Sequence, residues 1–123
     1  MPILNVEVIV ATGESVPREA AAAIADAAGA VLHSPKGRMW VRLRVLPLDH
    51  YAENGGGPDP GIRPVFVHVI RASIPPASEL EREASSLAAA IATALDRPVE
   101  NVHVLYEPPA AGRAAFGGKL FRG

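Results

Sequence analysis

The chain repeats one order of sequence patterns, and this repetition limits the folds it can adopt more than any other feature. One segment runs from Pro2 to Gly56 and the other from Pro64 to Gly118, so their starts lie about 62 residues apart. Each opens with proline and a β-branched run, continues through an alanine-rich stretch and a second apolar run, and ends in paired glycines. We therefore predict one domain over 1–123, with repeats at 2–56 and 64–118 and a linker at 57–63.

Periodicity assigns the elements inside each repeat. Alternating apolar residues predict a strand over 3–10, and short apolar runs predict strands at 40–46, 64–70 and 101–106. Apolar residues at spacings of three and four predict two helices; the residues that carry this pattern are Ala20, Ala23, Ala27 and Val31 in the first, and Leu80, Ala84, Leu87, Ile91 and Leu95 in the second.

Local signals suggest where these helices begin and end. Ser15 is the expected cap of the first helix, and Pro17 suits its first turn. The run Ser78-Glu79-Leu80-Glu81 has the pattern of a capping box, and Pro98 is expected to stop the second helix.

The doubled strand–helix–strand order predicts an α+β fold. A helix that joins two parallel strands makes a right-handed crossover, so two such units give a four-stranded sheet with both helices on one face. The opposite face mixes polar and apolar side chains, namely Asn5, Glu7, Trp40, Arg42, Arg44, Phe66, His68, His103 and Leu105. Such a face is too apolar for solvent, and we expect it to be covered by other subunits.

Composition excludes several classes of function. A net charge of -1 gives no overall field that would attract nucleic acid or an acidic membrane surface. The chain has no cysteine, and its four histidines lack metal-ligand spacing, so we expect no metal site. The glycine-rich stretch 54–61 lacks the lysine of a phosphate-binding loop. With no signal-like start and no membrane-spanning apolar run, a cytoplasmic protein is the expectation.

Three features together resemble the tautomerase superfamily: the Met1-Pro2 start before an apolar strand, the doubled unit, and the pairs Gly55-Gly56 and Gly117-Gly118. That superfamily includes 4-oxalocrotonate tautomerase, with one β-α-β unit per chain. Its fused relatives are the macrophage migration inhibitory factor group, carboxymethyl-hydroxymuconate isomerase, malonate semialdehyde decarboxylase and the cis-3-chloroacrylic acid dehalogenases. The likeness covers nearly the whole chain. It implies a homotrimer whose three sheets enclose a central barrel.

The resemblance makes Pro2 the candidate catalytic residue of a tautomerase. Removal of Met1 would convert the prolyl nitrogen of Pro2 from an amide into a secondary amine, whereas Pro64 stays an amide. A free α-amino group has a pKa of about 7.7–8.0, and burial beside cations lowers it. The neutral amine can then move a proton between carbons of an enol or a 2-hydroxydienoate, with no cofactor. The competing interpretation is that Pro2 simply follows Met1.

The expected small anionic substrate requires cations or hydrogen-bond donors near Pro2. Arg71 lies close to where fused relatives place carboxylate-binding arginines. The spacing of Lys36 to Pro47 matches the substrate-contacting lysine of the migration inhibitory factor group. For each residue an exposed surface cation is the alternative.

Four further residues are candidates for substrate binding. Arg42 and His103 occupy equivalent places in the two repeats, where 4-oxalocrotonate tautomerase has a substrate-polarising arginine. Arg113 and Phe116 belong to a late loop that reaches the site in relatives, with Phe116 as a pocket wall. A hydrogen-bonded structural histidine and a surface loop arginine are the alternatives for His103 and Arg113.

The departures from the family favour keto–enol tautomerisation. Dehalogenase relatives activate water with a histidine on the first helix and a glutamate in the final loop. This chain has alanine at Ala27 and Ala28 and again at Ala114 and Ala115. A decarboxylase or dehalogenase-type lyase or hydrolase stays open as an alternative, as does a non-catalytic trimeric binding module.

Overall fold

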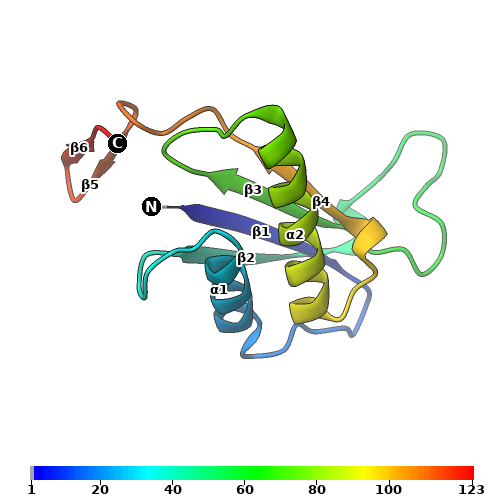
Figure 1. Ribbon diagram of the computed structural model, residues 1–123. Helices are drawn as coiled ribbons and strands as arrows, with labels where there is room; N and C mark the ends of the chain where they lie inside the picture. The colour runs from blue at the N-terminus through cyan, green and yellow to red at the C-terminus, as the bar shows by residue number, and fades with distance from the viewer. Residues whose placement is uncertain (1) are drawn as a thin grey trace.

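The computed structural model describes residues 2–123 and shows one four-stranded sheet with two helices on a single face (Figure 1). The sheet order is β2-β1-β3-β4; β1 pairs with β2 and β3 with β4 in parallel, and β1 pairs with β3 antiparallel. The elements are β1 (Ile3–Val10), α1 (Ala20–Val31), β2 (Trp40–Pro47), β3 (Val65–Ile70), α2 (Ala77–Leu95) and β4 (Val102–Tyr106). The predicted α+β fold is confirmed.

Shorter elements complete the chain. Single-turn 3-10 helices at Leu48–His50 and Val99–Asn101 join the larger elements. A separate antiparallel hairpin, β5 (Ala114–Phe116) and β6 (Lys119–Phe121), lies near the start of β1 in Figure 1. Neither α1 nor α2 combines the length and apolar character that a bilayer crossing requires.

The core lies between the sheet and the helices. Alternation along β1 turns Leu4, Val6 and Val8 toward the helices, where they are fully buried. The helices contribute Ile24 from α1 and Leu87 from α2 to the same core. Burying a side chain of this size stabilises the fold by about 1.5–3 kcal/mol, so this core is a main source of the stability of the fold.

The predicted helix caps are wrong. The N-cap residue of α1 is Glu19 rather than Ser15, and α2 begins directly after Pro76, with no side chain capping either helix. Instead the carbonyl of Pro17 accepts a hydrogen bond from the Ala20 N–H, so a turn precedes α1. The fixed φ of Pro76 sets the start of α2 and leaves Ser78 inside the first turn, where it cannot act as a cap.

The second face of the sheet carries the predicted mixture of side chains. The strand register places Asn5 between Arg42 and His68, and the Arg42 Nε donates to the Asn5 Oδ1 at 2.7 Å. Trp40 and Leu105 on this face are each 43% exposed. Within residues 2–123 neither α1 nor α2 packs on this face, which we call the open face.

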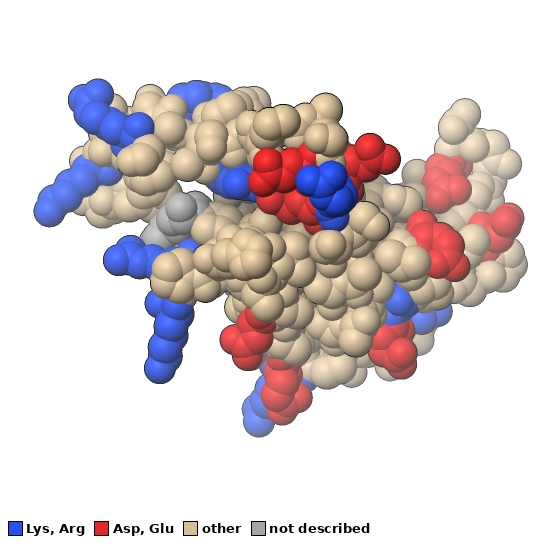
Figure 2. All heavy atoms as spheres, viewed as in Figure 1, with Lys and Arg blue, Asp and Glu red and all other residues tan. Residues whose placement is uncertain are grey.

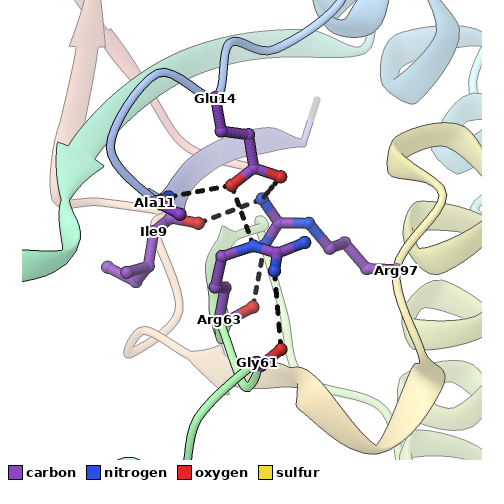
Figure 3. A network of polar contacts seen from close by, with 6 residues as sticks. All are labelled: Ile9, Ala11, Glu14, Gly61, Arg63 and Arg97. Carbon is purple, nitrogen blue, oxygen red and sulfur yellow. Dashed lines mark hydrogen bonds and ion pairs between the residues drawn. The ribbon is translucent and has the colours of Figure 1, made fainter.

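The end of β1 is closed by a buried arginine (Figure 3). The Arg97 side chain is 6% exposed and donates to the carbonyls of Ile9 at 3.0 Å and Arg63 at 2.7 Å. The Glu14 carboxylate forms ion pairs with the Arg97 Nη2 at 3.6 Å and with the Arg63 Nε at 2.8 Å. The contact with the Arg63 Nε lacks the geometry of a hydrogen bond. We call Glu14, Arg63 and Arg97 the arginine clamp.

Candidate active site

A cavity of about 470 Å³ lies at the start of β1 and is lined by Pro2. Its volume is within the range of small-molecule sites. Its other walls come from the loop after α1, the residue two before β2, the residues after β3, and β6; they are Leu32, His33, Ser34, Pro35, Arg38, Arg71, Ala72, Ser73 and Phe121. Both repeats and the C-terminal hairpin therefore contribute to one site.

Strand pairing on both sides of β1 fixes Pro2 in this cavity. The Trp40 N–H donates to the Pro2 carbonyl at 3.2 Å, which ties Pro2 to the start of β2. On the other side Ile3 pairs with Ile70, so Pro2 lies beside the residues that follow β3. The antiparallel contact between the repeats thus brings Arg71 to Pro2.

The electrostatic character of this end of the molecule is positive. Arg38 and Arg71, one from each repeat, line the cavity beside Pro2. Figure 2 shows Lys and Arg side chains gathered around the hollowed left end, where β1 begins, whereas most Asp and Glu lie over the helices and toward the right. Such a field favours anions and lowers the pKa of a nearby amine.

The guanidinium of Arg71 is held from behind by α2. Its Nη1 donates to the Glu83 Oε1, and the Tyr106 hydroxyl donates to the Glu83 Oε2 at 2.8 Å. Burial, and then the hydrogen bond to Glu83, raise the pKa of the Tyr106 hydroxyl above its ordinary value of 10. Tyr106 is therefore a protonated donor at neutral pH, and both Glu83 oxygens are occupied.

The C-terminal hairpin supplies an aromatic wall. Phe121 lines the cavity, and the Phe116 ring packs edge-on against Phe121 and Trp40, with centroids 5.6 Å apart in each pair. The hairpin turns at Gly117 and Gly118, whose φ angles of 60° and 82° are positive, a conformation in which glycine carries no steric penalty. The second glycine pair thus brings Phe121 back to the site.

The structure brings some of the proposed site residues to one place. Pro2 and Arg71 line the same cavity, and Phe116 supports its wall from the second layer. Lys36 lines a neighbouring hollow of about 350 Å³, which shares His33, Ser34 and Pro35 with the Pro2 cavity.

Three other proposed residues lie away from the Pro2 cavity in the single chain. Arg42 and His103 are on the open face, where Arg42 bonds Asn5 and the His103 ring packs against Phe66 at 5.4 Å. Arg113 is exposed, with its Nη1 at 3.5 Å from the Pro109 carbonyl. In the part of the chain that the structure describes, these three side chains therefore do not line the Pro2 cavity.

Sequence reasoning missed several lining residues. Arg38 could have been predicted, because the strand that begins at Trp40 had to lie parallel to the strand that begins after Pro2, so their starts lie close together. No signal marks His33, which adopts a positive φ of 52°, or Ser73 and Phe121, which tertiary structure brings in. Within residues 2–123, His, Asp and Glu form no group of three suited to hold a metal ion.

Known structures share this architecture. Macrophage migration inhibitory factor from Oncomelania hupensis is 23% identical, covering 98% of this chain and 83% of its own, with a TM-score of 0.73. The Q0 fused 4-OT symmetric trimer is 17% identical over 96% of this chain and 94% of its own, with a TM-score of 0.71. FG41 malonate semialdehyde decarboxylase inhibited by 3-bromopropiolate is 20% identical over 94% and 88%, with a TM-score of 0.63.

These likenesses define the fold. The sequence itself matches no protein-family model, and a search of curated proteins finds no significant match. The resemblance predicted from the doubled unit is confirmed at the level of fold: the chain has the architecture that macrophage migration inhibitory factor and fused 4-OT share. Identities below 25% leave the reaction to be argued from the site.

Proposed function

We propose that this protein is a cofactor-independent tautomerase that uses the amine of Pro2 as its acid–base group on small enol or 2-hydroxydienoate acids. The observation that carries this proposal is the cavity at the start of β1, which Pro2 shares with Arg38 and Arg71. Two arginines from different repeats beside Pro2 suit the binding of a small anionic substrate.

The chemistry follows from an amine among cations. Removal of Met1 makes the Pro2 nitrogen basic, and the neighbouring guanidinium groups disfavour its protonated form, so a neutral fraction exists at pH 7. That nitrogen accepts the proton from the enol hydroxyl or from one carbon of the substrate. It then returns a proton to another carbon, and the net change is an isomerisation. Arg38 and Arg71 bind the carboxylate and stabilise the developing enolate.

Assembly into a homotrimer is part of the proposal. The open face exposes Trp40 and Leu105 beside charged groups, and a fused 4-OT of the same fold is described as a symmetric trimer. Covering this face places Arg42 and His103 in a subunit interface. Light scattering coupled to size exclusion should give three times the mass of the chain, and a monomer would remove this part of the proposal.

The test of function combines the mature terminus with turnover. Mass spectrometry of the purified protein should show loss of Met1, and ultraviolet assays should show ketonisation of phenylenolpyruvate or 2-hydroxymuconate. Pro2→Ala should lower kcat/KM by about 10²–10⁴-fold, the usual range for a positioned acid–base group. The matched control is Pro47→Ala, at the exposed end of β2 opposite Val10, which should retain full activity.

Two results would redirect the proposal. Release of carbon dioxide or halide from suitable acids, without enol turnover, would assign the site to a lyase or hydrolase. A retained Met1 together with no turnover of any of these acids would favour a non-catalytic binding module.

A further inference from the structure

Arg71 differs from Arg38 in having an acidic partner at the rear of the cavity. Glu83 of α2 is absent from the cavity lining, yet it accepts the Arg71 Nη1 hydrogen bond, and its side chain is only 13% exposed. Arg38 forms no ion pair or side-chain hydrogen bond within residues 2–123. The two arginines therefore bring unequal charge to the same site.

The geometry also prevents Glu83 from releasing Arg71 easily. Tyr106 of β4 holds the second carboxylate oxygen of Glu83, and the main chain of Arg71 is fixed because its carbonyl accepts the Ala110 N–H at 2.9 Å. Only part of the donor edge of the Arg71 guanidinium remains for a ligand, since Glu83 occupies Nη1. Arg71 can thus orient an anion, but its charge is already balanced.

We propose that Glu83 is a positioning residue that also sets the charge selectivity of the cavity: it fixes Arg71 beside Pro2 and cancels its charge, so that the site prefers a monocarboxylate to a dicarboxylate. This inference rests on the proposed function for the identity of the site. One uncompensated cation, Arg38, matches one carboxylate. A second carboxylate would lose its hydration without gaining a free cation, which is unfavourable.

A purely structural role for Glu83 makes a different prediction. If the carboxylate only ties α2 to β3 and β4, its loss changes stability and weakens all ligands alike. If it sets the charge of the cavity, its neutralisation improves the binding of dianions relative to monoanions. The ratio of two affinities separates these roles, because a general loosening of the site cancels in the ratio.

The experiment measures calorimetric binding of 3-phenylpropanoate and glutarate, which are unreactive mono- and dicarboxylate probes, to the full-length protein. Wild type should prefer 3-phenylpropanoate. Glu83→Gln keeps the size of the side chain and should shift the ratio toward glutarate by about tenfold, the scale of one added charge at partly screened distance. Glu81→Gln, an exposed change on the same helix, should leave the ratio unaltered.

Two more variants guard against a folding defect. Glu83→Asp retains the charge and should restore the wild-type ratio. Tyr106→Phe removes a neutral donor but keeps the Glu83 charge and its bond to Arg71, so it should not shift the ratio toward glutarate. An unchanged ratio in Glu83→Gln overturns the inference, and so does a shift toward glutarate in Glu83→Asp or Tyr106→Phe, both of which keep the charge.

The outcomes also separate this inference from the proposed function. Failure of both probes to bind wild type overturns the inference. A shifted ratio without enol turnover leaves the charge device intact and removes the tautomerase. Turnover that depends on Pro2, with an unshifted ratio, supports the tautomerase and removes the charge selectivity proposed for Glu83.

Discussion

The two ends of β1 use arginine in opposite ways. At the far end, the Arg97 side chain is 6% exposed, and the guanidinium meets two main-chain carbonyls and Glu14 in the arginine clamp (Figure 3). At the near end, Arg38 is exposed and lines a cavity with Pro2. A guanidinium whose donors bond the backbone holds the fold together, whereas one with free donors beside a cavity can bind an anion.

The difference has a physical cause in the connections. The chain passes from β1 to α1 and from α2 to β4 at the far end, and there Arg97 donates a hydrogen bond to the Ile9 carbonyl near the end of β1. Burial lowers the pKa of Arg97, an effect that Glu14 opposes, so the clamp keeps its charge at the cost of solvation. At the near end, the connections from α1 to β2 and from β3 to α2 instead line a cavity beside Pro2.

The largest effect on stability is expected in the arginine clamp. Arg97→Ala leaves the carbonyls of Ile9 and Arg63 without their donors, and we expect the free energy of unfolding to fall by about 3 kcal/mol. Urea denaturation measures it, and the exposed Arg122→Ala should change it by less than about 0.5 kcal/mol. Equal losses in the two variants would show that the clamp has no special role.

The second effect concerns binding rather than folding. Arg38→Ala should raise KM for an enol acid by about tenfold, because one charge-assisted contact to the carboxylate is lost. Unfolding free energy should stay within about 0.5 kcal/mol of wild type, since Arg38 is exposed. A steady-state assay at matched protein mass checks the first value. A stability loss as large as that of Arg97→Ala would erase the contrast between the two ends.

The smallest effect appears at high pH. The folded protein raises the pKa of the Tyr106 hydroxyl above 10, mainly through burial and then through Glu83. The stability linked to this shift is present below pH 10 and is lost as pH rises from about 10 toward the folded-state pKa.

Urea denaturation at pH 9 and pH 11 should therefore show a fall in the unfolding free energy that Tyr106→Phe reduces. The matched control is Tyr51→Phe, whose hydroxyl donates to Glu53 at an exposed site and should reduce the fall far less. An identical fall in wild type and Tyr106→Phe would contradict the raised pKa of the Tyr106 hydroxyl.

The fold could be predicted from the sequence because its signals are periodic. Alternation in β1 and the three-to-four spacing in α1 and α2 depend on which face meets the core, and burial enforces both. The starts of the helices were predicted less accurately. Ser15 and Ser78 are common capping residues, but Pro17 and Pro76 fix the backbone φ angle near each start and so determine where the helix begins.

The site was predictable only where strand register decides it. Pro2 and Arg71 meet because β1 and β3 pair antiparallel, a consequence of joining the two repeats into one sheet. Alternation places Arg42 on the open face with Asn5, away from the strand end where Pro2 lies. His33 and Phe121 reach the cavity through loop and hairpin geometry, which no residue pattern encodes.

The central claim is that the Pro2 nitrogen is a free amine whose pKa is lowered by its cationic cavity. A ¹⁵N NMR titration of proline-labelled mature protein measures that pKa directly. A free Pro2 amine that titrates at least one unit below the ordinary 7.7–8.0 is the predicted result, and Arg38→Ala should raise the value. An acylated Pro2 nitrogen, or an amine that titrates at or above 8, would contradict the account.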